Sequence, residues 1–195
     1  MKKQLIMIAT IGVAVCCLGA CKKASNGNEY DALNSMLDAN YSKIELTVTD
    51  TIDENLALTS LYTISYAQSE ITVKYSVEKL TEISLDNPTS GIKTTLIGEA
   101  VIKDGSVTIN GDDAGITADI AELKLTFKSD YFTNTQLTGN YLKADVKNVS
   151  AFLGSQISCT EMKVNATFLE VFYDIQITYT AESGSKVEYK YVFNI

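Results

Sequence analysis

The sequence predicts a mainly β fold: an antiparallel meander of about nine or ten strands, arranged as a half-barrel or a sandwich, with one N-terminal amphipathic helix. Apolar and polar residues alternate over most of the chain after residue 43, which is typical of strands that bury one face. Short turn-forming stretches separate these runs and favour antiparallel connections. Helical spacing of apolar residues is clear only near the start.

The predicted helix covers residues 29–40. Tyr30, Leu33, Met36 and Leu37 repeat at intervals of three and four residues, which places them on one face. Asn28 precedes them as a suitable N-cap. We expect this apolar face to pack on the sheet.

The first strands are predicted where residues alternate in Ile44–Val48, Tyr62–Tyr66 and Ile71–Val77. Residues 50–55 and 67–70 are polar and are expected to form the turns between them.

The next part of the chain is less regular. Residues 80–85 lead to Asn87-Pro88, the only proline, which marks a loop or a sheet edge. Two β-prone runs between Thr94 and Asn110 flank Asp104-Gly105, a pair that favours a tight hairpin.

Residues 110–119 are expected to form a loop. Leu123, Leu125 and Phe127 then alternate as a further strand. In Leu137–Val146 the apolar parity changes, and we interpret this as one strand with a bulge near Asn140. Residues 148–154 are expected to make one helical turn.

The C-terminal part has the most regular pattern. Alternation runs through Met162–Phe168, Val171–Tyr179 and Val187–Ile195, and the turn Glu182–Ser185 separates the last two runs. These segments predict a meander that ends in a long hairpin.

The first 21 residues have the layout of an export signal. Lys2 and Lys3 precede an apolar run that ends in Leu18-Gly19-Ala20-Cys21. This tetrad resembles the lipobox of bacterial lipoproteins, and the resemblance implies that residues 1–20 are removed and that Cys21 carries a diacylglyceryl and acyl anchor. Residues 21–28 would then be the acylated cysteine and a polar tether, and residues 29–195 one β-rich domain. Cleavage as a plain secretory signal, or an uncleaved anchor, is the alternative.

Composition excludes several function classes. With residues 1–20 removed, 14 lysines stand against 24 acidic residues, a formal charge of −10, which opposes binding to nucleic acid. The chain has no histidine and no arginine, which removes the usual acid–base catalyst and the bidentate anion clamp. We therefore expect no enzymatic activity, no catalytic residues and no cofactor; a hydrolase that uses a pair of carboxylates is the alternative, because the separation of such a pair is spatial and is not visible in the sequence.

Two groups of polar residues have a simpler interpretation than a site. The acidic loop with Asn110, Asp112, Asp113 and Asp119 does not match the EF-hand pattern, so we expect a solvated loop and no metal. We assign the acidic residues of 50–54 to solvent in the same way. Cys159 shares the parity of Ile157 and is expected to be a buried, inert thiol.

Tyrosines are the candidate ligand-binding residues. The chain has 11 tyrosines and six phenylalanines, and a core that only excludes water has little use for the extra hydroxyls. Seven tyrosines share the apolar parity of their strands: Tyr62, Tyr66, Tyr75, Tyr173, Tyr179, Tyr189 and Tyr191. They could line a cleft for an amphiphilic ligand. Their β propensity alone, with hydroxyls reaching solvent, is the alternative explanation.

A helix followed by an antiparallel meander on a lipobox anchor resembles the LolA/LprG-type lipoprotein carriers in layout. That resemblance implies a half-barrel that accepts acyl chains, and no functional residue is transferred by it. Two hypotheses follow: an anchored lipoprotein that binds a hydrophobic or amphiphilic ligand, or a structural, adhesin-like module of the cell envelope. The domain would face the extracytoplasmic side of a cell membrane or an outer membrane, the latter being allowed because Lys22 follows Cys21.

Overall fold

The computed structural model describes residues 27–38, 41–67, 69–81, 92–121, 124–169 and 172–194. The predicted signal peptide, Cys21 and most of the predicted tether lie outside these residues. So do the predicted segment 82–88 and Leu123.

Ten antiparallel strands form one sheet, which confirms the predicted fold class. The strands are β1 (Lys43–Asp53), β2 (Leu56–Tyr66), β3 (Ile71–Thr81), β4 (Ile92–Lys103), β5 (Ser106–Gly111), β6 (Phe132–Thr138), β7 (Tyr141–Val146), β8 (Cys159–Leu169), β9 (Phe172–Ala181) and β10 (Lys186–Asn194). Their order is β5-β4-β3-β2-β1-β10-β9-β8-β7-β6. The first and last strands thus pair at the centre, and β5 and β6 are the edges. Within the described residues all strands belong to this one sheet, so they do not form the predicted sandwich, and the sheet does not close into a barrel.

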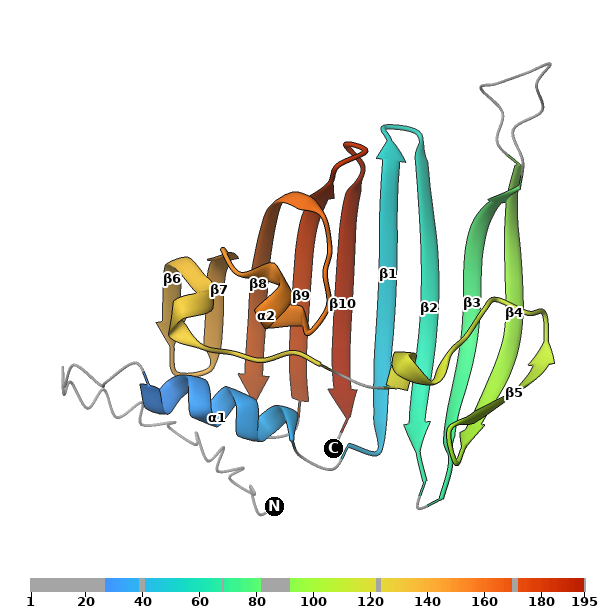
Figure 1. The fold of residues 1–195 in the computed structure, drawn as a ribbon, viewed down its shortest axis with the longest axis horizontal. Helices are drawn as coiled ribbons and strands as arrows, with labels where there is room; N and C mark the ends of the chain where they lie inside the picture. The colour runs from blue at the N-terminus through green and yellow to red at the C-terminus, as the bar shows by residue number, and fades with distance from the viewer. Residues whose placement is uncertain are drawn as a thin grey trace, which may run out of the picture.

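The helical elements of the described chain are short. They are α1 (Gly27–Leu37), the 3-10 helices η1 (Ala118–Ala121) and η2 (Ser129–Tyr131), and α2 (Val149–Leu153). Figure 1 shows that α1, η1, η2 and α2 all lie on one face of the sheet. Tyr30 and Leu33 of α1 are buried. The amphipathic character predicted for this helix also depends on Met36, whose side chain lies outside the description, and it stays a prediction.

The core lies on this covered face, as the period-two alternation requires. Strand pairing places its side chains in rows across the sheet. One row contains Tyr75, Tyr62, Leu46, Tyr191 and Ile175. The next contains Val73, Ile64, Ile44, Phe193 and Tyr173. Phe127, Phe132, Phe152 and Phe168 pack against one another under the covering elements, with ring centroids 5.3–6.4 Å apart.

The sequence predicts a strand at Leu123–Phe127, but the described part of that segment, residues 124–127, is not a strand. Leu125 and Phe127 are buried, as the alternation suggested, but residues 124–128 have no ladder partner. The backbone N–H of Thr126 donates to the carbonyl of Phe152 at 2.9 Å. The Asn34 side chain accepts from the N–H of Phe127 and donates to its carbonyl, each at 2.8 Å. The alternation therefore predicted the burial of Leu125 and Phe127 correctly, but the strand pairing that it predicted is wrong.

Leu137–Val146 is a hairpin and not one bulged strand. Thr138 pairs with Tyr141 across the two-residue loop Gly139-Asn140. Gly139 has φ +46°, a left-handed conformation that suits the first position of such a loop. The change in parity that we assigned to a bulge is this turn. A register shift does occur in β6, between Thr133 and Gln136.

The predicted tight hairpin at Asp104-Gly105 is confirmed, and the predicted turn at residues 50–55 is wrong in length. Asp104 and Gly105 both have positive φ between paired Lys103 and Ser106, as a tight hairpin requires. The predicted turn at residues 50–55 is too long, because β1 continues to Asp53. Asp50 therefore lies inside a strand.

Candidate ligand-binding cleft

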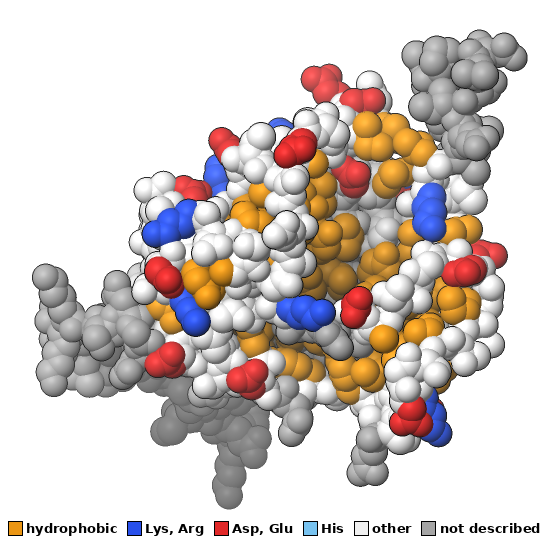
Figure 2. Space-filling model, in the orientation of Figure 1, with side chains coloured by type: hydrophobic (Ala, Val, Ile, Leu, Met, Phe, Trp, Pro, Cys, Tyr) orange, Lys and Arg blue, Asp and Glu red, His pale blue; other side chains and the backbone are white. Residues whose placement is uncertain are grey.

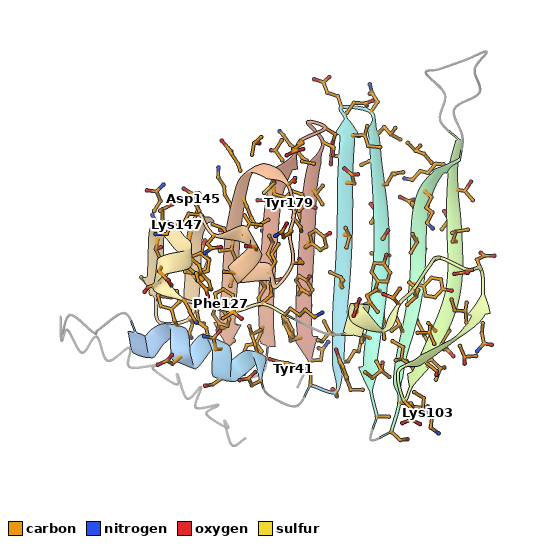
Figure 3. All side chains as sticks on the ribbon, viewed as in Figure 1. Tyr41, Lys103, Phe127, Asp145, Lys147 and Tyr179 are labelled. Carbon is orange, nitrogen blue, oxygen red and sulfur yellow. The ribbon has the colours of Figure 1, made fainter. Side chains whose placement is uncertain are left out.

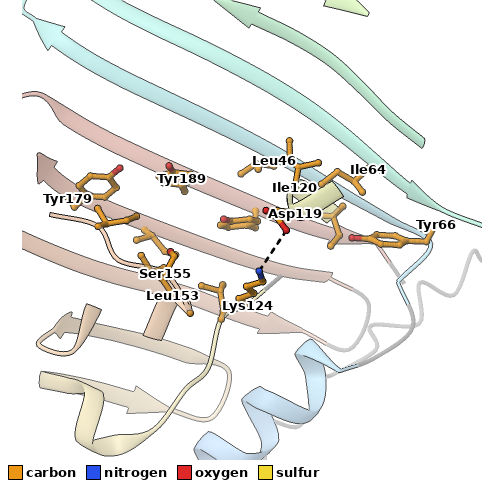
Figure 4. A pocket seen from close by; sticks show the side chains of 16 residues that line it. Leu46, Ile64, Tyr66, Asp119, Ile120, Lys124, Leu153, Ser155, Tyr179 and Tyr189 are labelled. Carbon is orange, nitrogen blue, oxygen red and sulfur yellow. Dashed lines mark ion pairs between the residues drawn. The ribbon is translucent and has the colours of Figure 1, made fainter. Parts of the chain in front are cut away.

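An open cavity of about 360 Å³ lies on the covered face of the sheet. Its floor comes from the four central strands, and its walls come from η1, residues 124–125 and the segment that follows α2. Figure 2 shows this face hollowed in its middle, with hydrophobic side chains exposed in the hollow. The lining residues are Ile44, Leu46, Ile64, Tyr66, Asp119, Ile120, Lys124, Leu125, Leu153, Gly154, Ser155, Ile157, Ile177, Tyr179, Tyr189 and Tyr191. Figure 4 shows the cleft from close by.

Three tyrosines of the floor belong to a row of aromatic rings that continues beyond the cleft. The ring centroids of Tyr179 and Tyr189 are 6.1 Å apart, those of Tyr189 and Tyr191 are 6.4 Å apart, and those of Tyr191 and Phe193 are 6.2 Å apart. The three pairs have interplanar angles of 13–20°, so the rings are nearly parallel. Tyr41 continues the row, 4.9 Å from Phe193. Figure 3 shows Tyr179 and Tyr41 towards opposite ends of the central strands.

This row follows from strand geometry. Residues i and i+2 of β10 point to the same face, and pairing places Tyr189 beside Val48 and Ile177, and Tyr191 beside Leu46 and Ile175. Because β10 lies at the centre of the sheet, the rings are held on both sides by buried or half-buried neighbours. The aromatic surface of the floor is therefore preformed.

The wall after α2 is fixed by its two helix ends. The Asn148 side chain caps α2 by accepting from the N–H of Ala151 at 3.3 Å. Gly154 ends the helix with φ +63°, a conformation that costs glycine little. Phe152 is fully buried, so Leu153, Ser155 and Ile157 are carried against the cleft by an anchored turn.

The charged lining residues form an ion pair, and the tyrosines stay neutral. Lys124 Nζ lies 4.0 Å from Asp119 Oδ1, an interaction drawn in Figure 4. Burial raises the pKa of Tyr66, Tyr179 and Tyr191 above the ordinary value of 10. Tyr179 and Tyr189 also share a hydrogen bond that raises the pKa of Tyr179 further. At neutral pH these hydroxyls donate and accept hydrogen bonds and carry no charge.

The structure brings together four of the seven tyrosines selected from the sequence: Tyr66, Tyr179, Tyr189 and Tyr191. The other three tyrosines lie on the same covered face of the sheet but do not line the cleft. Tyr62 packs against the core beside Leu46. Tyr75 is buried and donates a hydrogen bond to the carbonyl of Asp112. Tyr173 is buried and packs edge-on against Tyr41 at 6.4 Å.

Sequence reasoning missed the covering half of the cleft. Ile120 and Leu153 line it from segments with no strand periodicity, so only their apolar character signalled burial, and Leu125 lines it from a segment predicted as a strand. It also missed Asp50, which we assigned to solvent. One carboxylate oxygen of Asp50 is buried without a hydrogen-bond partner.

The acidic loop uses its carboxylates locally. Asp112 accepts from the N–H of Ile97 at 3.0 Å, and Asp113 from the N–H of Gly115 at 2.8 Å. Within the described part of the chain, no three Asp, Glu or Cys side chains gather as a metal site would require. Cys159 is half-buried against the core, and burial raises its thiol pKa.

Comparison with known proteins identifies no relative: no family model, no curated protein and no solved structure matches the chain. None of the helices in the described ranges is long and apolar enough to cross a membrane.

Proposed function

We propose that this protein is an exported, lipid-anchored lipoprotein that binds a hydrophobic or amphiphilic small molecule in the cleft over β2, β1, β10 and β9. The observation that carries the proposal is the cavity of about 360 Å³, which falls in the range of small-molecule sites, roughly 300–1,000 Å³. Its aliphatic and aromatic lining suits an apolar chain or ring system, and its tyrosine hydroxyls supply a few polar contacts.

Binding without chemistry fits this lining better than catalysis. The tyrosines have pKa values raised by burial, so they are poor proton donors and bases near neutral pH. Asp119 and Lys124 are paired with each other at the surface. A preformed aromatic floor and neutral hydroxyls support holding a ligand, which is the role implied by the resemblance to lipoprotein carriers.

Two variants at neighbouring positions test the cleft. Ser155 and Gln156 are both exposed, and only Ser155 lines the cavity. We expect the neutral apolar fluorophore N-phenyl-naphthylamine to bind the wild type with a gain in fluorescence. Ser155→Trp should weaken that binding at least about tenfold by filling the cleft, and Gln156→Trp should leave it unchanged. Equal binding by the two variants would refute the site. Native mass spectrometry of protein from its own host would then show whether a displaceable ligand accompanies it.

Anchoring is tested separately, because Cys21 lies outside the described residues. Cells supplied with labelled palmitate should label the wild type and not Cys21→Ser. Equal labelling of both would refute the lipid anchor and leave the cleft untouched as a separate question.

A second candidate is an envelope interaction module. The open edges β5 and β6 and two exposed apolar side chains support it, since Leu61 is 50% exposed and Ile97 is 62% exposed on the uncovered face. Both pair with Ser76 of the intervening strand, so they lie in one row. This candidate predicts that Leu61→Thr together with Ile97→Thr abolishes attachment to envelope fractions while fluorophore binding persists. Unchanged attachment would remove it.

A further inference from the structure

The two charged side chains of the cleft lie at its rim. Of the described residues that line the cleft, only Asp119 and Lys124 carry a charge. Their side chains are 79% and 48% exposed, whereas the floor residues Leu46 and Ile64 are buried. A ligand that fills the cleft therefore contacts apolar and aromatic groups on the floor and meets these two charges where it reaches solvent. We call Asp119 and Lys124 the rim pair.

The rim pair joins two covering segments across the mouth of the cleft. Asp119 belongs to η1, whereas Lys124 lies in the segment that is bonded to α2 through Thr126 and Phe152. Gly154 lets Lys124 approach the end of α2, because a Cβ atom built on Gly154 would lie 2.8 Å from the Cβ of Lys124. The base of the lysine side chain is thus held against the wall, and its amine reaches towards η1, as Figure 4 shows.

The contact within the rim pair is loose enough for a ligand to replace it. Lys124 Nζ and Asp119 Oδ1 are 4.0 Å apart, and both side chains are accessible to solvent. Ion pairs of this kind contribute little to stability, so separating them costs little. A singly charged head group at the rim would attract one member of the pair and repel the other. A head group with both signs of charge would give each member an opposite charge.

We propose that the cleft selects amphiphiles with a zwitterionic head group, whose anionic part binds Lys124 and whose cationic part faces Asp119, while the apolar part lies on the floor. This inference rests on the proposed function and adds the class of head group. The rim pair is then the specificity-determining part of the cleft, and the floor supplies contacts that any apolar chain can make.

Three competitors with one decyl chain test the head group: decylphosphocholine, decyl sulfate and decyltrimethylammonium. Each is used below its critical micelle concentration to displace N-phenyl-naphthylamine from the full-length, unlipidated Cys21→Ser protein. Decylphosphocholine should compete at least about fivefold better than either singly charged compound. General attraction of a cation to this acidic protein would instead rank decyltrimethylammonium first.

Single substitutions in the rim pair should shift the ranking in opposite directions. In Lys124→Gln, decyl sulfate should bind more weakly than in wild type, and the advantage of decylphosphocholine over decyltrimethylammonium should fall below about twofold. In Asp119→Asn, decyltrimethylammonium should bind more weakly, and the advantage of decylphosphocholine over decyl sulfate should fall below about twofold. Should either variant fail to fold, the ranking of the three competitors on the intact rim pair still decides the head-group class.

Lys190→Gln and Asp174→Asn are the matched controls. Lys190 Nζ lies 3.8 Å from Asp174 Oδ2, so these residues form an ion pair of similar length. Lys190 alternates along β10 with the cleft residues Tyr189 and Tyr191, which places this second pair on the uncovered face of the sheet. Each control makes the same change of charge as one of the rim variants. Both controls should keep the wild-type ranking.

The outcomes are separable. If the fluorophore binds and the three competitors displace it equally, or the cation displaces it best, the head-group selection is overturned and the cleft remains a binding site. A zwitterion preference that persists in both Lys124→Gln and Asp119→Asn would overturn the role of the rim pair. Failure of the fluorophore and of every competitor to bind the wild type would overturn both this inference and the proposed function.

Discussion

A single methyl group added at Gly98 is expected to destabilise the sheet. Gly98 of β4 lies directly opposite Tyr75 of β3. A Cβ atom added at Gly98 would overlap with the Tyr75 hydroxyl oxygen, and it would lie 2.7 Å from Cζ of that ring and 2.8 Å from the carbonyl oxygen of Asn110. Ordinary contacts between such atoms are about 3.5–4.0 Å. The missing side chain is therefore the space in which the tyrosine ring lies.

The size of the stability loss depends on how far the Tyr75 ring must move. Tyr75 is only 3% exposed, and its hydroxyl bonds the carbonyl of Asp112, so the ring has no alternative place. Overpacking of this kind costs about 1–3 kcal/mol, and the displaced hydrogen bond about 0.5–1.5 kcal/mol. Alanine loses less backbone entropy on folding than glycine does, and this offsets the cost by about 0.5–1 kcal/mol. The midpoints of these ranges combine to a loss of about 2 kcal/mol in the free energy of unfolding for Gly98→Ala, or a fall in Tm of roughly 4–8 °C.

Urea unfolding followed by far-ultraviolet circular dichroism measures this, since the chain has no tryptophan. Gly184→Ala is the control, because Gly184 has φ +88° in the β9–β10 turn and no atom within 4 Å of an added Cβ. It should cost about 1 kcal/mol from backbone strain alone. Adding Tyr75→Phe to Gly98→Ala should recover part of the loss, because the nearest atom is removed. The reasoning would be refuted if Gly98→Ala were as stable as wild type, or if the double variant recovered nothing.

Further predictions concern the tyrosines and α2. Burial raises the pKa of Tyr191 above the value of 10 expected in the unfolded chain, so its contribution to stability is complete below pH 10 and is lost as pH rises beyond it. The urea midpoint should fall more steeply above pH 10 in wild type than in Tyr191→Phe, whereas Tyr141→Phe, an exposed position, should follow wild type. Asn148→Ala removes the cap of α2 and should cost about 1 kcal/mol, against less than about 0.5 kcal/mol for exposed Ser150→Ala; equal losses would argue against the cap. Phe152→Ala should cost about 3–5 kcal/mol by calorimetry and weaken fluorophore binding, because Phe152 anchors the wall of the cleft; a loss under 1 kcal/mol would contradict that anchoring.

The sequence predicts faces of strands much better than it predicts what covers them. Alternation identified the inner face of β8, β9 and β10, and with it Tyr179, Tyr189 and Tyr191, because burial of one face imposes a period of two. It failed at Leu125 and Phe127, which alternate in burial while their backbone is bonded to Phe152 and to the Asn34 side chain. A side-chain partner leaves no periodic signal in the sequence.

Asp50 shows a second kind of limit. An acidic residue next to Asp53 and Glu54 is typical of a solvated turn, and nothing local indicates that β1 continues through it. Its burial results from pairing with β10, whose residues lie more than 130 positions away. Register between segments so far apart is fixed by the whole sheet and not by local composition.

Pairing of β1 with β10 also explains why the cleft lies where it does. The sheet consists of two meanders, β1 to β5 and β6 to β10, joined only by this central pair. Residues 112–121 cover the first meander, while α1, α2 and residues 124–131 cover the second, so the two covers meet over the junction. There they contribute Asp119 and Ile120 from one side and Lys124, Leu153 and Ser155 from the other, and the floor between them stays open. Because the covers of the two meanders leave this part of the floor open, the apolar and aromatic side chains that line it are accessible to a ligand.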